Sequence, residues 1–331
     1  MIIDLPDTTV SKIAKALVSV REEGGAVALG RVLTLIILTR HGAEEEVIEA
    51  ANDASREHPM RVIVLMSDPH GPGADTDPRL DAEIRVGGDA GASEVIVLRA
   101  YGAAGNNSES LVTGLLLPDA PVVAWWPRET PTQPSRSSIG RIAQRRITDA
   151  ATQPDPAAWV AGLAGHYAPG DTDFAWTRVT HWREQLAAVL DQPPYEPVTA
   201  VEVRGAADSP STAFLAAWLR LKLDAPVAWT YMDASEWAHG IKSVRLTRAS
   251  GDILLERPEP GVAVLTQPGQ PSHELAFPRR TLRECLAEEL RSLDPDLLYG
   301  RVISQGWDLL HLDGEDRRRD DAERDDAERD D

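Results

Sequence analysis

The chain has 331 residues, of which 42% are apolar, enough for two ordinary domains with separate hydrophobic cores. Its net charge of −19 repels nucleic acid and anionic lipid, so neither nucleic acid nor a membrane is an expected partner. A single cysteine, Cys285, excludes an intramolecular disulfide. The N-terminus lacks a signal-peptide pattern and no apolar run could span a bilayer, so we expect a cytoplasmic protein.

The first third of the chain alternates between strand and helix patterns. A nearly continuous apolar run at 32–39 predicts a strand that is covered on both faces, and runs at 61–66 and 94–98 predict two more. Apolar residues at helical spacing predict helices after Thr9 and over 44–57. Because strands alternate with helices, we expect a mostly parallel sheet.

The second half also mixes helices and strands. Thr281 and Glu284 have the spacing of a capping box, which predicts a helix that starts there. The other expected elements are a helix at 175–190, a strand at 198–203, a helix at 212–223 and a meander of strands at 244–248, 253–256 and 262–266.

A shift in composition near 168–173 predicts a domain boundary. We expect an α/β fold of two related lobes, an N-terminal domain over 1–168 and a C-terminal domain over 169–312. Each should have a mostly parallel or mixed central sheet flanked by helices. Residues 313–331 hold eleven acids and five arginines without an apolar face, which predicts a disordered charged tail.

One short sequence occurs twice. Asp119–Trp125 (DAPVVAW) recurs as Asp224–Trp229 (DAPVAW), and each copy follows a Leu-rich helix pattern that itself follows a strand and a glycine. The constant offset suggests two similar β-loop-α-β units. Chance similarity between ordinary βαβ segments is the alternative.

Motifs for catalysis and cofactor binding are missing. The chain has no Walker A loop, no G-x-S-x-G elbow and no histidine or cysteine spacing typical of a metal site, so we expect no catalytic residues, metal or cofactor. Gly102, Gly105 and Ser108 follow a strand and could open a helix as a phosphate-binding turn. The alternative there is a structural turn. Cys285 falls on the apolar face of its helix, which favours a buried, inert thiol.

Two tryptophans end a predicted strand. Trp125 and Trp126 should point to opposite faces, so one ring could enter the core while the other lies at the carboxyl end of the sheet. The alternative is that both pack in the core.

A cationic segment follows these tryptophans in an otherwise acidic chain. Arg136, Arg141, Arg145 and Arg146 could bind phosphate or carboxylate, since a guanidinium group forms two parallel hydrogen bonds to either. The alternative is a solvated face on which Asp149 pairs with Arg145 or Arg146.

With AWTRVTHWR at 175–183, these segments resemble the OpcA family of glucose-6-phosphate dehydrogenase assembly proteins, in its actinobacterial form. The similarity runs from Met1 to about Leu310. Its other matching stretches are 27–39, 116–127, 140–149 and 299–309.

The resemblance implies a non-catalytic partner of glucose-6-phosphate dehydrogenase that promotes its assembly or allosteric activation. That enzyme opens the oxidative pentose phosphate pathway, so NADPH supply would be the output. Photosynthetic relatives are associated with cysteine-based redox control, which a chain with only Cys285 is not expected to use. Interfaces favour Trp and Arg anchors, and the expected anchors here are Trp125, Trp126, Arg141, Arg145, Arg146, Trp176 and Trp182.

Two other functions stay open. An enzyme acting on sugar phosphates would use the turn at 102–108 together with the arginine segment as a phosphate cradle. A sensing module would bind a metabolite or NADP(H) and pass the information to another protein.

Overall fold

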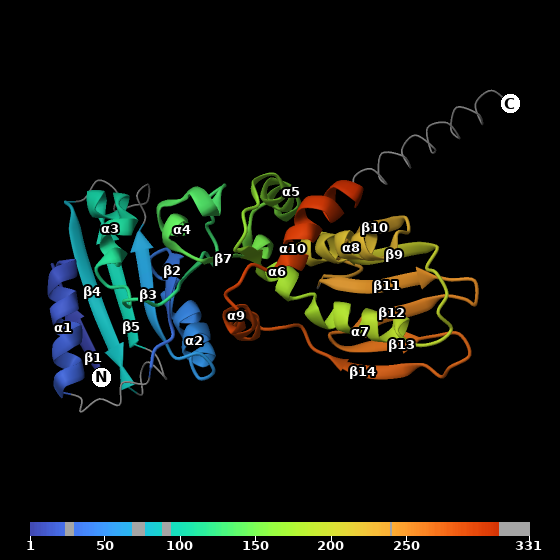
Figure 1. Ribbon diagram of the computed structural model, residues 1–331, viewed down its shortest axis with the longest axis horizontal. Coiled ribbons are helices and arrows are strands. Elements are labelled where there is room, and N and C mark those ends of the chain that lie inside the picture. Colours follow the sequence, from blue (N-terminus) through green and yellow to red (C-terminus); the bar gives the residue numbers. More distant parts are fainter. Residues whose placement is uncertain (24–29, 68–76, 88–93, 239, 311–331) are drawn as a thin grey trace, which may run out of the picture. The chain divides into compact units, whose positions relative to one another are not determined.

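The computed structural model describes residues 1–23, 30–67, 77–87, 94–238 and 240–310. They form a mixed α/β fold with two β-sheets flanked by helices, as the sequence predicts (Figure 1). The expected disordered tail at 313–331 lies outside the described residues. Among the helices in the described ranges, none combines the length and apolar character that a membrane crossing requires.

Two compact units make up the chain, and they interleave along the sequence. The domains expected from the sequence are continuous and meet at residue 168, whereas each compact unit takes segments from both sides of that position. Unit 1 comprises residues 1–152, 168–174 and 281–295, and unit 2 comprises residues 153–167, 175–280 and 296–331.

Unit 1 contains an eight-stranded sheet within the described residues, in the order β1-β4-β5-β3-β2-β6-β7-β8. The strands from β5 to β8 in this order are parallel, and β1 and β4 add an antiparallel edge, so the mostly parallel sheet is confirmed. The strands are β1 Ile2–Leu5, β2 Leu33–Thr39, β3 Met60–Ser67, β4 Arg79–Val86, β5 Glu94–Tyr101, β6 Val122–Trp125, β7 Arg145–Thr148 and β8 Asp171–Asp173.

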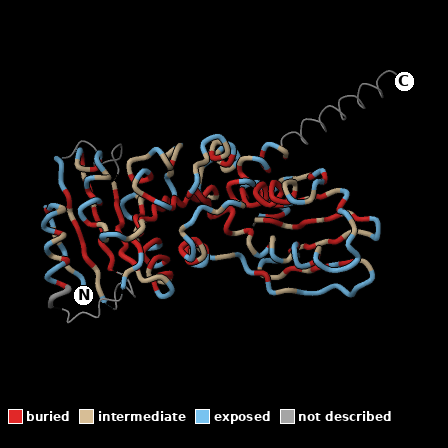
Figure 2. Tube along the Cα trace, viewed as in Figure 1, coloured by how far each residue is buried: buried red, intermediate tan, exposed pale blue. Residues whose placement is uncertain are grey.

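The two faces of this sheet carry separate apolar cores. Leu35 and Ile37 lie in one core and Ile36 in the other, because successive side chains of a strand point to opposite faces. The central strands are buried along most of their length (Figure 2). The first face is covered by α2 (Glu44–Ala54) and α9 (Leu282–Arg291), and the second by α1 (Val10–Glu23), α3 (Ser108–Thr113) and α4 (Ser138–Ile142).

Helix α9 reaches unit 1 from late in the chain and starts with the predicted capping box. The Glu284 backbone N–H donates to Thr281 Oγ1 at 3.3 Å, and the Thr281 N–H donates to Glu284 Oε2 at 2.8 Å. Cys285 is fully buried in the core between α9 and the sheet, as its place on the apolar face predicts.

Unit 2 contains a six-stranded sheet within the described residues, in the order β10-β9-β11-β12-β13-β14. Only β9 and β10 are parallel there, and β11 to β14 form the predicted meander. The strands are β9 Ala200–Ala206, β10 Val227–Met232, β11 Ile241–Thr247, β12 Ile253–Glu259, β13 Gly261–Thr266 and β14 His273–Phe277.

Helices of unit 2 pack around the long α8 (Pro210–Leu223), whose first three turns are buried. Gly306 approaches α8 so closely that a Cβ there would lie 2.6 Å from the Ala217 carbonyl oxygen, so only glycine fits. The expected helix at 175–190 is in fact two helices, α6 and α7, which are separated at residues 178–179. The remaining helices are α5 Pro156–His166, α6 Phe174–Thr177, α7 Thr180–Leu190 and α10 Leu297–Arg301.

The repeated DAPV sequence places its aspartate in the left-handed region in both units. Asp119 and Asp224 have left-handed φ angles of 55° and 47°, and each precedes a strand, β6 or β10. The sheets nevertheless differ, because β9 and β10 are neighbours whereas β3 and β2 lie between β5 and β6. The left-handed aspartate is therefore shared, but the strand order is not.

The left-handed turn at Asp119 generates a stability prediction. We expect Asp119→Val to lower the free energy of unfolding by about 1–2 kcal/mol, because a Cβ-branched residue is strained at this φ. Asp119→Gly should change it by less than ~0.5 kcal/mol, since glycine adopts this conformation freely. Urea unfolding of both variants measures the difference, and equal losses would contradict the assignment.

Candidate functional site

Trp125 and Trp126 lie at the carboxyl end of β6, and their rings enter opposite cores of unit 1. Trp125 is fully buried and meets the Phe174 ring edge-on, with centroids 5.6 Å apart. Trp126 is buried in the second core. The opposite-face prediction is confirmed, but both rings pack in the interior.

Arg145 and Arg146 lie side by side on β7 and are both buried. The Arg145 guanidinium pairs with Glu289 of α9 and donates to the Asp294 carbonyl oxygen at 2.7 Å. Arg146 pairs with Asp171 of β8 and donates to the carbonyl oxygen of Ala143 at 2.8 Å. These guanidinium groups hold α9 and β8 against β7.

Arg141 differs from its neighbours because its side chain is 60% exposed. It donates to the Arg136 carbonyl oxygen at 3.0 Å and lies 3.5 Å from a carboxylate oxygen of Glu109 on α3. An exposed ion pair of this kind contributes little to stability, so Arg141 can exchange this contact for one with a partner.

Trp176 and Trp182 are buried in unit 2. The Trp176 ring lies under the Arg183 guanidinium at 3.8 Å, and its indole N–H donates to the Asp296 carboxylate at 2.9 Å. Trp182 meets the Phe277 ring edge-on at 5.1 Å. Both rings join α6 and α7 to the rest of the unit.

Gly102 and Gly105 form a 3₁₀ turn between β5 and α3, and both are buried. A Cβ at Gly105 would lie 3.2 Å from the Ser67 Cβ, so close packing against β3 explains this glycine. Ser108 begins α3, a helix of six residues whose first turn is capped by the Asn107 side chain. These contacts match the structural-turn alternative, and phosphate binding at this turn stays a prediction.

Six of the seven expected anchors are therefore buried in this conformation, and Arg141 is the exception. These four rings and two guanidinium groups are occupied by internal packing and ion pairs. Their contribution to partner binding stays a prediction.

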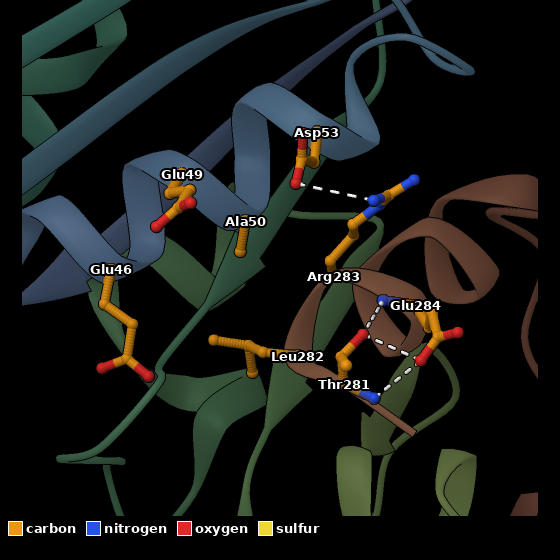
Figure 3. A pocket seen from close by; sticks show the side chains of 8 residues that line it. All are labelled: Glu46, Glu49, Ala50, Asp53, Thr281, Leu282, Arg283 and Glu284. Atoms are coloured by element: carbon orange, nitrogen blue, oxygen red, sulfur yellow. Dashed lines mark hydrogen bonds and ion pairs between the residues drawn. The ribbon is translucent and has the colours of Figure 1, made fainter. Parts of the chain in front are cut away.

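Unit 1 contains a groove of about 440 Å³ between α2 and the start of α9 (Figure 3). Ala50 and Leu282 supply its apolar floor, and Leu282 extends towards α2. Carboxylates of Glu46, Glu49, Asp53 and Glu284 surround this floor, with Arg283 as the single lining cation.

The groove charges are only partly compensated. Asp53 lies 3.8 Å from Arg283, and Glu284 is held by the Thr281 cap. Glu49 is exposed and forms no hydrogen bond or ion pair with another residue that the structure describes. No sequence pattern points to this groove, because its two helices lie far apart in the chain. No His, Cys, Asp or Glu cluster suited to a metal ion occurs in the part of the chain that the structure describes.

Comparison with models of known protein families identifies the family of this chain. Residues 51–164 match the glucose-6-phosphate dehydrogenase subunit N-terminal domain, and residues 169–303 match the corresponding C-terminal domain of the OpcA family. The chain belongs to the OpcA family of glucose-6-phosphate dehydrogenase assembly proteins. No curated protein matches the sequence of this OpcA-family chain significantly.

Solved structures resemble this OpcA-family chain only distantly. An oxidoreductase from Sinorhizobium meliloti has a TM-score of 0.47 and 11% identity, over 86% of this chain and 97% of its own. An inositol dehydrogenase homolog from Azotobacter vinelandii, in complex with NADH and myo-inositol, has a TM-score of 0.39 and 10% identity, over 88% and 89% of the two chains. Similarity at this level assigns neither a cofactor nor a reaction.

The buried Arg145–Glu289 pair generates a second prediction. We expect Glu289→Ala to lower the free energy of unfolding by about 3–5 kcal/mol, because it leaves the Arg145 charge buried without its carboxylate. Arg291→Ala is the control on the same helix: its pair with Glu57 is exposed and should contribute less than ~1 kcal/mol. Chemical denaturation compares them, and similar losses would contradict the structural role of the pair.

Proposed function

We propose that this chain is a non-catalytic assembly factor and allosteric activator of glucose-6-phosphate dehydrogenase, acting in the cytoplasm and supporting NADPH supply. The observation that carries the proposal is the match to both domains of a family named for a subunit of that enzyme, over residues 51–164 and 169–303. The net charge of −19 also favours a protein partner over nucleic acid.

Activation needs no chemistry from the activator. If the dehydrogenase exchanges between a weak and an active form, a protein that binds the active form better shifts the population towards it. A coupling free energy of about 1–3 kcal/mol would change substrate affinity roughly 5–150-fold. By reciprocity, substrate would tighten the complex by the same factor.

Two surfaces of unit 1 suit this partner. The groove between α2 and α9 combines the apolar Ala50 and Leu282 with a mainly acidic border, which favours a basic segment of the dehydrogenase that carries an apolar side chain. Arg141 is the exposed member of the expected anchors and would pair with a carboxylate of the enzyme.

Mixing the purified chain with glucose-6-phosphate dehydrogenase from the same organism tests the proposal. We expect the two proteins to elute together in size-exclusion chromatography, and the half-saturating glucose 6-phosphate concentration of the enzyme to fall at least about fivefold. The chain alone should not turn over glucose 6-phosphate or 6-phosphogluconolactone. Separate elution with an unchanged saturation curve would overturn the proposal.

Variants that reverse or remove a surface charge test which surface binds the dehydrogenase. Glu49→Lys should weaken the complex roughly tenfold, because it places a cation where the groove would meet a basic segment. Arg141→Ala should weaken it by a similar factor if its guanidinium contacts the enzyme. The control is Asp4→Lys, which reverses an exposed carboxylate on β1, outside the groove. Titration calorimetry measures all three, and wild-type affinity for Glu49→Lys would remove the groove from the interface.

A further inference from the structure

Unit 2 contains a second, small pocket whose lining is cationic. It lies where α7, the start of α8, β11, β12 and the segment after β14 meet. Its ionisable lining residues are Arg178, His181, Arg257 and Arg279, and no carboxylate is among the residues that line it. His181 contacts Glu184, an exposed residue outside the lining, at 3.1 Å.

Arg257 is the buried centre of this pocket, with only 6% of its surface exposed. One of its terminal nitrogens donates to the Phe277 carbonyl oxygen at 3.0 Å, and the guanidinium lies 5.4 Å from the Trp182 ring centre. Its Nε has no hydrogen-bond partner. Within the described ranges, no carboxylate forms an ion pair with Arg257.

Three other buried arginines have the carboxylate partner that Arg257 lacks. Arg61 pairs with Glu94 at 2.6 Å, and Arg145 and Arg146 each pair with a buried carboxylate. Burial without such a partner disfavours the charged form, and the pKa of Arg257 is lowered first by burial and then by the nearby Arg279 charge. A buried cation without a countercharge raises the free energy of the folded state, so the pocket favours the binding of an anion.

Helix α8 adds a second source of positive potential. This 14-residue helix starts at the pocket with Ser209 and Ser211 among the lining residues, and its N-cap Ser209 makes no side-chain capping hydrogen bond. Helix N-termini attract anions through their dipole and free N–H groups. In α8, Pro210 has no N–H and the Thr212 N–H donates to the Ser209 carbonyl oxygen at 3.1 Å, which leaves the Ser211 N–H and the helix dipole. Arg279 is exposed at the pocket mouth and can close over a ligand from solvent.

We propose that this pocket binds a small oxyanion, the phosphoryl group of a phosphate monoester or inorganic phosphate, between Arg257, Arg279 and the N-terminus of α8. The pocket encloses about 30 Å³, which admits one anionic group and leaves the rest of a larger ligand in solvent. This site is separate from the turn at residues 102–108, and it does not depend on dehydrogenase binding.

Titration calorimetry of the full chain with inorganic phosphate tests the site, against sodium chloride at equal ionic strength. We expect saturable binding of one phosphate per chain, with chloride giving none. Arg257→Met and Arg279→Gln should each weaken phosphate binding roughly tenfold or more, because each removes a charge-assisted hydrogen bond. Arg245→Met is the control, since Arg245 lies on the same sheet and pairs with Asp252 at 2.9 Å outside the pocket.

Thermal unfolding supplies a second measurement. In phosphate-free buffer, Arg257→Met should unfold at a higher temperature than the wild type, because it removes an uncompensated buried charge, and it should lose the rise in Tm that phosphate gives the wild type. Arg279 is exposed, so Arg279→Gln tests the site even if Arg257→Met fails to fold. Absence of saturable phosphate binding, or wild-type affinity in Arg279→Gln, would overturn the proposal. Titration with glucose 6-phosphate then distinguishes a phosphate monoester from free phosphate as the preferred ligand.

Discussion

Burial of the unit 1 sheet on both faces is the constraint on which the rest of that unit depends. The parallel strands β2, β3 and β5 are mainly apolar and buried along most of their length, so each face needs its own layer of helices. One of these helices, α9, comes from far later in the chain and brings Cys285, Leu286 and Leu290 to the first core. The interleaving of the two units therefore follows from the need to cover a two-sided apolar sheet.

Arg61, Arg145 and Arg146 are buried against carboxylates, whereas buried Arg257 has no carboxylate partner within the described residues. Arg145 and Arg146 satisfy carboxylates on α9 and β8, and losing either partner would leave a charge in a medium that solvates it poorly. Arg257 is buried to a similar extent but meets aromatic rings and one carbonyl oxygen. A buried arginine that is paired with a carboxylate has a structural role, whereas one without a carboxylate partner is a candidate ligand site.

Membership of the OpcA family associates this chain with glucose-6-phosphate dehydrogenase. The groove between α2 and α9 has an apolar floor and a mainly acidic border, and Arg141 is exposed elsewhere on unit 1. The cationic pocket of unit 2 has the opposite charge and a smaller volume. The protein partner and the small anion that we propose would therefore contact different side chains of the chain.

The sequence by itself determined the α/β class, the parallel sheet of unit 1, the meander of unit 2, the capping box at Thr281 and the family. These features depend on local apolar periodicity and short motifs, which can be read along the chain. Only the tertiary structure decided that Trp125, Trp176 and Arg145 are buried and that Arg257 lacks a carboxylate. Exposure and charge pairing depend on which distant segments meet. Arg145 meets Glu289 across a separation of 144 residues, and no local pattern encodes that contact.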